Sequence, residues 1–188
     1  ALAIDGQPQV EFLRIGHFIA RHQPRADRTE GIEALALAPL PAAAVELVGA
    51  LGNVVGQTVA GDVVNAGWLA PGSYNDKFGT FTVGGNYTGQ PGGKLSIYSV
   101  LGGDASPTSK LVVEGDTEGS PTNIRVINQN GSGGYTDKGI LIVDVQGKSD
   151  PNAFTLAYDY KQPDGTAAVA AGKYLYHLQY NQEDGDWY

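Results

Sequence analysis

Residues 101–117 read Leu-Gly-Gly-Asp-Ala-Ser-Pro-Thr-Ser-Lys-Leu-Val-Val-Glu-Gly-Asp-Thr. This stretch places a short apolar run, residues 111–113, between two groups of turn-forming residues. Glycine accepts left-handed backbone angles at little cost, and aspartate bonds its own backbone in turns, so both residue types interrupt strands. Brief apolar runs bounded in this way predict short β-strands. Because similar runs recur on both sides, we expect an all-β chain.

The composition is that of a folded domain. The chain has 188 residues and 41% hydrophobic residues, enough for one continuous core. Cysteine is absent, which excludes a disulfide framework and a thiolate metal site. Methionine is absent too, even at position 1, so we expect a processed piece or an excised fragment. No apolar run approaches the roughly 20 residues that a membrane-spanning helix needs.

The charge balance is acidic, with a formal net charge of −8 and a sequence pI of about 4.7. A nucleic-acid partner would need a basic face, so none is predicted. Basic residues gather in one segment near the start, which also contains His17 and His22. Its arginines are Arg14, Arg21, Arg25 and Arg28. We interpret this segment as an exposed loop.

Three zones differ in sequence pattern. Residues 1–44 fit neither the helical nor the strand period, and a β-helix turn carrying the Arg-rich loop as an insertion is one interpretation of them. Residues 45–103 contain short β-segments separated by Gly or Asn, which suits the stem of a parallel β-helix. An antiparallel sandwich stays open as the alternative. Residues 104–188 carry longer strands and are interpreted as a C-terminal cap.

Aromatic residues concentrate near the C-terminus. Tyr174, Tyr176, Leu178 and Tyr180 alternate with other residues, and a period of two places them on one face of a strand. Trp187 follows this ladder closely. A stack of coils leaves open strand edges and an uncovered core at its last turn. We therefore expect the aromatic segment to cover that end, and to act as a nucleus for folding.

Motifs that would indicate catalysis are missing. The sequence has no G-x-S-x-G elbow, no P-loop and no dinucleotide fingerprint, so no catalytic residue, cofactor or enzymatic activity is predicted. The acidic groups at 114–118 and 183–186 lie in turn-like sequence, which argues against paired catalytic carboxylates. The five-residue spacing of the two early histidines does not suit a metal site, and none is predicted.

Several blocks, in order, carry a family resemblance. They are Asn-Ala-Gly-Trp-Leu-Ala-Pro-Gly at 65–72, Gly-Gly-Asn-Tyr-Thr-Gly at 84–89, Leu-Gly-Gly-Asp-Ala-Ser-Pro-Thr at 101–108, and the closing Gly-Asp-Trp-Tyr at 185–188. From about residue 63 to the end, the chain resembles the C-terminal passenger region of bacterial autotransporters, the pertactin-like type V secreted proteins. The first forty-odd residues lie outside the resemblance.

The resemblance implies a right-handed, single-stranded parallel β-helix that ends in an autochaperone (junction) region with a C-terminal β-strand cap. It also implies a cell-surface location and a partner absent from this chain, the protein's own outer-membrane β-barrel. In this family the region promotes folding of the passenger as it emerges. Our candidates for that role are the five cap residues named above, with Leu111, Val112 and Val113 beneath them.

Two rival functions remain at this stage. The first is an adhesin segment that binds a host-surface glycan or matrix protein through the Arg-rich loop 14–28. The second is a glycan hydrolase that uses one of the carboxylate groups. The preferred interpretation is a non-enzymatic stem and intramolecular chaperone.

Overall fold

The computed structural model of the chain describes residues 45–47, 50–53 and 56–188. Three parallel sheets form its body. The first sheet has the order β1 (Val45–Leu47), β4 (Val63–Asn65), β7 (Tyr87–Gly89) and β10 (Thr117–Gly119). The second has the order β2 (Ala50–Asn53), β5 (Trp68–Ala70), β8 (Lys94–Ser99), β11 (Thr122–Asn128) and β13 (Phe154–Ala157). The third has the order β3 (Thr58–Val59), β6 (Thr80–Val83), β9 (Lys110–Val113) and β12 (Val143–Val145).

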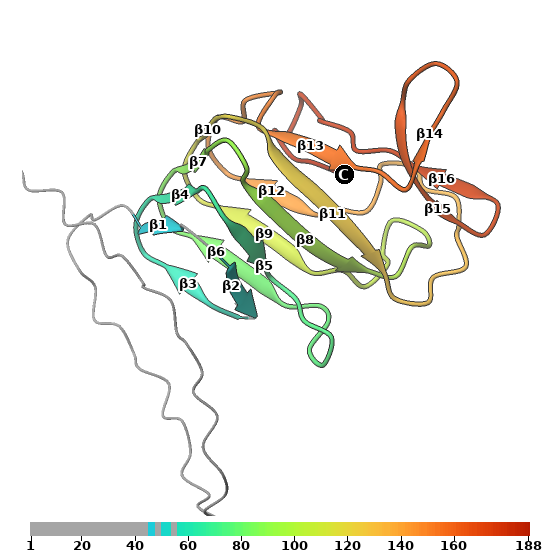
Figure 1. The fold of residues 1–188 in the computed structure, drawn as a ribbon, viewed down its shortest axis with the longest axis horizontal. Coiled ribbons are helices and arrows are strands. Elements are labelled where there is room, and N and C mark those ends of the chain that lie inside the picture. Colours follow the sequence, from blue (N-terminus) through green and yellow to red (C-terminus); the bar gives the residue numbers. More distant parts are fainter. Residues whose placement is uncertain (1–44, 48–49, 54–55) are drawn as a thin grey trace, which may run out of the picture.

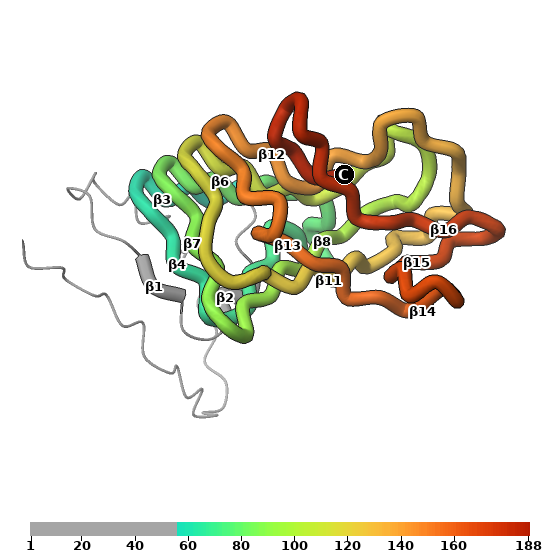
Figure 2. The backbone as a smooth tube through the Cα atoms, turned by 90° about the horizontal axis from the view of Figure 1, so that it is seen from above, coloured from blue at the N-terminus to red at the C-terminus, as the bar shows by residue number. Residues whose placement is uncertain are grey.

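Consecutive strands enter the three sheets in turn, so the chain winds as a coil. Strands β4–β6, β7–β9 and β10–β12 make three successive turns, and β1–β3 pair in parallel with the first of them. Figure 2 shows these turns side by side, with the C-terminal segment away from the end that carries β3. The expected all-β parallel coil is confirmed, and the antiparallel sandwich is not what these residues form.

The core of the coil is built from stacked columns of inward-facing side chains. In the second sheet, Leu69, Leu95 and Ile124 lie in register, and each is fully buried. In the third sheet, Phe81, Leu111 and Val143 form the corresponding column. Strands with one inward face alternate between buried and less buried residues, as in β9, where Leu111 and Val113 are buried and their neighbours are not. Each added turn therefore extends every column by one side chain.

One corner of the coil repeats a short motif that the sequence reading missed. Val-x-Gly followed by Asp, Asn or Lys occurs between the third and first sheets at 59–62, 83–86, 113–116 and 145–148. The side-chain oxygen of each Asp or Asn accepts the backbone N–H of its counterpart one turn later. The N···O distances are 2.7 Å from Asn86 to Asp62, 2.9 Å from Asp116 to Asn86, and 2.7 Å from Lys148 to Asp116. We call this column the corner ladder.

Glycine is required in the corner ladder. A Cβ built on Gly115 would overlap the side-chain oxygen of Asn86 and would lie 2.6 Å from the carbonyl oxygen of Gly85. The ladder ends at Lys148, whose side chain has no acceptor oxygen. The corner is therefore a site where the backbone of one turn is held by a side chain of the turn before it.

We expect Asp116→Ala to lower the free energy of unfolding by about 1 kcal/mol, because the N–H of Lys148 loses the acceptor that caps it, as in the loss of a helix N-cap. Asp116→Asn keeps an acceptor oxygen and should stay close to the wild-type value. Urea unfolding followed by far-UV circular dichroism measures both. Equal losses in the two variants would contradict a role for the oxygen.

Beyond the coil, the chain turns antiparallel. Strands β14 (Tyr160–Lys161), β15 (Ala167–Ala171) and β16 (Tyr174–Tyr176) form a three-stranded sheet in that order. Figure 1 shows this sheet beyond the end of β11 and β13. The three parallel sheets continue across residue 103 without a break, and the antiparallel part begins only after β13. The described residues contain no helix long and apolar enough to cross a membrane.

Some local expectations need correction. Strand β7 was not foreseen, because its Tyr-Thr-Gly is too short to show alternation. Within the apolar run 140–145, only β12 is a strand, and Trp187 forms a single-residue bridge to its Val143. Segment 54–55 and the Arg-rich loop lie outside the described residues. The ladder after residue 173 is a strand only as far as Tyr176.

The C-terminal cap as the candidate functional site

Trp187 lies at the end of the third sheet. It pairs with Val143 in antiparallel fashion and so continues the column that contains Phe81 and Leu111. The N–H of Trp187 donates to the carbonyl of Val143 at 2.9 Å, and the N–H of Val143 donates back at 3.2 Å. The carboxylate of Asp186 accepts the N–H of Val145 at 2.9 Å. The edge of β12 is thus closed by two residues of the C-terminal turn, which removes an open sheet edge.

The ring of Trp187 is 3% exposed and belongs to a chain of aromatic contacts. It meets Phe154 edge-on with ring centroids 5.3 Å apart, and Phe154 stacks on Tyr87 at 5.7 Å. The ring centroid of Tyr180 lies 5.2 Å from that of Trp187. Edge-to-face and offset pairs at these separations stabilise beyond simple burial. The chain of rings therefore connects the cap with the interior of the coil.

The polar tips of this aromatic group converge on Ser149. The indole N–H of Trp187 donates to the Ser149 hydroxyl at 3.1 Å, and the Tyr180 hydroxyl donates to the Ser149 carbonyl at 3.2 Å. Ser149 itself bridges to Thr117 in the first sheet. The buried tryptophan therefore keeps its donor satisfied while it covers the core.

Deeper in the coil, Tyr87 is fully buried and carries a polar network. Its hydroxyl accepts from the Asn65 amide at 2.7 Å and lies 2.9 Å from the Thr122 hydroxyl. Burial raises the pKa of Tyr87 to about 12, and the two hydrogen bonds oppose that rise. The network ties three successive turns together through side chains, because Asn65, Tyr87 and Thr122 belong to consecutive turns.

Three residues of the expected aromatic ladder pack against the core. Tyr176, Leu178 and Tyr180 are half-buried and pack against the core, whereas Leu175 is 42% exposed and Gln179 is exposed. The hydroxyl of Tyr176 accepts the N–H of Gly134 at 2.7 Å and lies 2.9 Å from the carbonyl oxygen of Gly102. Through Tyr176, this strand is therefore hydrogen-bonded to the two loops of the coil that contain Gly102 and Gly134.

Tyr174 and His177 also contact their surroundings in this segment. Tyr174 is half-buried, and its ring lies close to Gly133. His177, which lies between Tyr176 and Leu178, is half-buried. One of its ring nitrogens lies 2.8 Å from the Ala167 carbonyl and the other 3.1 Å from the Gln162 amide.

The glycine-rich run 131–134 is tightly placed rather than a free turn. Gly133 has φ of 85°, and a Cβ there would overlap the carbonyl oxygen of Ala171 in β15. A side chain at this position would strain the backbone and push the two segments apart. The sequence signal for this contact was the run of glycines itself.

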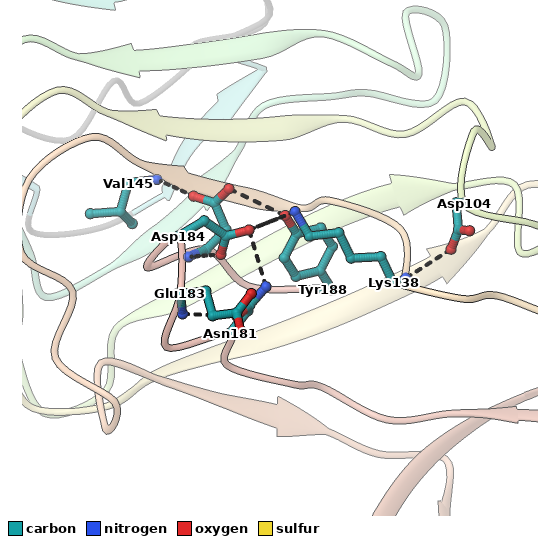
Figure 3. A network of polar contacts seen from close by, with 9 residues as sticks. Asp104, Lys138, Val145, Asn181, Glu183, Asp184 and Tyr188 are labelled. Carbon is teal, nitrogen blue, oxygen red and sulfur yellow. Dashed lines mark hydrogen bonds and ion pairs between the residues drawn. The ribbon is translucent and has the colours of Figure 1, made fainter.

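A polar network closes the outer side of the cap (Figure 3). The ammonium of Lys138 lies 2.6 Å from the Asp184 carboxylate and 4.8 Å from the centre of the Tyr188 ring. The Tyr188 hydroxyl donates to Asp184 at 2.9 Å and lies 3.3 Å from an Asp186 oxygen. The hydrogen bond to Asp184 raises the pKa of Lys138, so the ammonium stays charged.

The carboxylates in and beside this network respond differently to their surroundings. The backbone N–H groups of Gly139 and Asp137 lower the pKa of Asp104 below its ordinary value, at N···O distances of 2.8 and 3.1 Å. Burial is the largest influence on Asp184 and opposes its ionisation, but the hydrogen bonds from Lys138, the Asp186 backbone and Tyr188 together outweigh burial and lower the pKa. Burial raises the pKa of Asp186, and the neighbouring charges of Asp144 and Asp184 add to that rise.

Acid should weaken the cap. The lowered pKa values of Asp104 and Asp184 give stability that is present above the unfolded-state pKa of about 3.9 and is lost as the pH falls through the folded values. The contribution of Asp186 to the pH dependence of stability has the opposite sign, because its raised pKa favours the folded state at low pH. We expect a net loss of folding stability below about pH 4. It is measured as a decrease in the midpoint temperature of thermal unfolding. Asp104→Asn should shrink that loss, whereas Asp76→Asn, in a distant turn, should not.

The other predicted residues are placed as follows. Leu111 and Val113 face the core, but Val112 lies on the outer face of β9 and is only half-buried. Arg14, Arg21, Arg25 and Arg28 lie outside the described residues. Within the part of the chain that the structure describes, no group of three or more His, Cys, Asp or Glu side chains is arranged to hold a metal ion.

The acidic groups at 114–118 and 183–186 have structural contacts. Asp116 belongs to the corner ladder, and Asp184 and Asp186 belong to the cap. Glu118 accepts a hydrogen bond from Thr88, its register partner in the neighbouring strand.

Residues 57–178 of the chain match the family described as Autochaperone Domain Type 1. The chain belongs to this autochaperone family. It is also similar to curated autotransporters. An adhesin named BmaC autotransporter, from Brucella suis biovar 1 (strain 1330), is 38% identical over 80% of this chain and 5% of that protein. The autotransporter adhesin AIDA-I of Escherichia coli is 43% identical over 58% of this chain and 8% of that protein.

The probable autotransporter YfaL of Escherichia coli (strain K12) is 38% identical over 58% of this chain and 8% of that protein. The chain thus spans 5–8% of the length of these three relatives. The autochaperone region described here is part of an autotransporter passenger, and it is located at the bacterial cell surface, anchored to the outer membrane or secreted. The expected resemblance to type V autotransporters is confirmed.

Proposed function

We propose that the C-terminal part of this chain is an intramolecular chaperone: the cap orders first, and the turns of the passenger then fold onto it from the C-terminal side. The role requires no chemical step, and we propose that the region is non-catalytic. The observation that carries the proposal is Trp187, which ends the core column of the third sheet and closes the edge of β12.

The cap includes an antiparallel hairpin and a C-terminal turn whose own contacts are local and can form early. Strands β15 and β16 are adjacent along the chain and antiparallel, and residues 179 and 188 exchange backbone hydrogen bonds at 2.9 Å in each direction. Closing a short loop costs less entropy than joining distant strands, so local hairpins form before non-local pairs. In a stack of turns the first stable unit is the least favourable to form, and later turns add to it.

A folded cap offers a template for the turn before it. Each parallel strand presents backbone groups to its neighbour, and an added strand gains hydrogen bonds as well as a place in the side-chain columns. At the corner ladder, the free N–H of an ordered turn is ready to receive the Asp or Asn oxygen of the turn that precedes it in sequence. Each earlier turn that is added to the folded cap thus completes one more hydrogen bond of the corner ladder.

The partner that this role implies in the full protein is its own outer-membrane β-barrel, through which the passenger would reach the surface. We propose the three domain zones as functional zones too, with 45–103 as stem, 104–188 as cap and nucleus, and 1–44 as an added turn with its Arg-rich loop. The nucleus comprises Tyr174, Tyr176, Leu178, Tyr180 and Trp187, with Leu111, Val112 and Val113 beneath. Binding of a host receptor is not favoured by any described residue.

Deletion of residues 173–188 in the full-length protein tests this function. Export is followed by antibody labelling of intact cells, and folding by resistance of the displayed passenger to trypsin. We expect the deletion to leave any displayed passenger protease-sensitive. Normal, protease-resistant display would refute the proposal. Tyr176→Ala/Leu178→Ala should weaken resistance in the same way, while the outward-facing pair Leu175→Ala/Gln179→Ala serves as a matched control.

A further inference from the structure

The outer face of the second sheet is basic, although the chain as a whole has a formal net charge of −8. Strands β5, β8, β11 and β13 contain no Asp or Glu, and their outward side chains include the exposed Lys94 and Arg125. By contrast, acidic residues occupy outward positions in the first and third sheets, at Glu118 and Asp144. We call the outward side of these four strands the basic face. Its charge suits an anionic partner.

Lys94 and Arg125 are close enough for one ligand to contact both. Arg125 is in register with Ser96, which is two residues beyond Lys94 on the same side of β8. The spacings of strands and residues place the two Cα atoms about 8 Å apart. Neither cation forms an ion pair with another described residue. The carboxylates next along the chain from β13, at Asp150 and Asp159, lie beyond its two ends, so the basic face keeps its positive charge.

Trp68 gives this face an apolar ring in a fixed position. It is in register with Lys94, and its indole N–H donates to the hydroxyl of the buried Ser96 at 2.7 Å, so the ring reaches across to β8. The side chain remains 39% exposed although its only donor is already bonded. A sugar ring has an apolar side made of C–H groups, which can pack against such an aromatic surface while its polar substituents reach charged neighbours.

We propose that the basic face binds a phosphorylated saccharide of the bacterium's own outer-membrane surface, with a sugar ring against Trp68 and phosphate groups at Lys94 and Arg125. The cell-surface location of the region brings such a ligand within reach, because the outer leaflet of a bacterial outer membrane carries phosphorylated lipopolysaccharide. Arginine holds a phosphate through two parallel hydrogen bonds, and lysine acts as a point charge. Binding of this kind holds the stem against the cell envelope and does not depend on the folding role.

Three soluble probes separate the parts of this proposal. The first is the phosphorylated oligosaccharide obtained by deacylating lipopolysaccharide. The second is the same oligosaccharide after removal of its phosphates, and the third is polyglutamate of equal charge. Each probe is titrated into the whole chain, and binding is followed at the two tryptophan indole N–H signals in NMR spectra. We expect the phosphorylated oligosaccharide to shift the signal of Trp68 and to leave that of the buried Trp187 in place.

The order of affinities tests the charge and the ring separately. The dephosphorylated oligosaccharide should bind about tenfold more weakly than the phosphorylated one, because it lacks the charge that both cations contact. Polyglutamate should bind about fivefold more weakly, because it has no sugar ring to lie against Trp68. Polyglutamate that binds as tightly as the phosphorylated oligosaccharide would overturn the assignment of a saccharide.

Variants locate the binding surface. Lys94→Ala and Arg125→Ala should each weaken binding of the phosphorylated oligosaccharide about fivefold, the usual effect of one cation near an anionic surface. Lys148→Ala removes an equally exposed charge from another part of the coil and is the matched control. Trp68→Ala should also weaken binding about fivefold, and Trp68→Phe, which keeps an aromatic ring, should recover most of that loss. Far-UV circular dichroism verifies that each variant is folded.

Three further results would overturn the proposal. One is a Trp68 signal that does not move at the highest concentration of phosphorylated oligosaccharide. Another is equal weakening by Lys94→Ala and Lys148→Ala, since the attraction would then not be specific to the basic face. The third is binding that Arg21→Ala/Arg25→Ala abolishes and Lys94→Ala leaves unchanged, because the anion would then lie at the Arg-rich loop. None of these results bears on the folding role, which is tested by refolding and surface display.

Discussion

Replacing Trp187 by alanine is expected to lower the free energy of unfolding by about 3–5 kcal/mol, the usual cost of removing a fully buried tryptophan. The ring is 3% exposed, and its loss would leave Phe154 and Tyr180 without their shared partner. The Ser149 hydroxyl would also lose its indole donor. Urea unfolding of the purified chain at neutral pH measures the effect.

The other tryptophan is a built-in control for this experiment. Trp68 lies in β5, is 39% exposed and donates its indole N–H to Ser96 at 2.7 Å. Because less surface is buried, Trp68→Ala should cost about 1–2 kcal/mol. Kinetics separate the two further: if the cap belongs to the nucleus, Trp187→Ala slows refolding, whereas Trp68→Ala mainly speeds unfolding. A Trp187→Ala chain that refolds at the wild-type rate would contradict the assignment of Trp187 to the folding nucleus.

Leu111→Ala should destabilise the chain by about 2–5 kcal/mol, because it opens a cavity in the middle of the third-sheet column. Leu111 is fully buried and stacks between Phe81 and Val143. Removing it interrupts the only column that continues through the parallel strands directly to Trp187, within the residues that the structure describes. Thermal and urea unfolding give the loss.

Val112 offers the matched comparison, since it is the next residue along the same strand and points outward. Val112→Ala should cost less than about 1 kcal/mol. Similar losses for the two variants would mean that the inward and outward faces of β9 are not distinct energetically. That result would contradict the column as a source of stability.

The coil could be predicted because short apolar runs alternated with Gly, Asn and Asp, and because ordered sequence blocks carried the family resemblance. The corner ladder was missed although its signal, Val-x-Gly-Asx, is present three times and is followed by a fourth Val-x-Gly at 145–147. Loops of different length separate the repeats, such as residues 71–79 and 129–142, so no constant interval reveals them. The structure reveals the repeat, because the side-chain oxygen of Asn86 accepts the backbone N–H of Asp116 in the next turn.

In the cap, the period of two correctly put Tyr176, Leu178 and Tyr180 on one face, because alternation is a local property of extended chain. The place of Trp187 could not be read in the same way. Its pairing with Val143 joins residues far apart in sequence, and no local pattern encodes a single-residue bridge. The same limit applies to Val112, whose outward direction depends on the register of β9 with its neighbours.

The most direct test of cap-first folding is pulsed hydrogen exchange during refolding of this chain, with protection read at single amides. The amides of Val143 and Trp187 report the cap, since they hydrogen-bond each other's carbonyls. The amides of Val63 and Gly84, which bond Asn86 and Val59, report the first complete turn. The proposed order predicts that Val143 and Trp187 become protected first and that Gly84 and Val63 follow. Protection of the early turn before the cap, or of both at one rate, would contradict it.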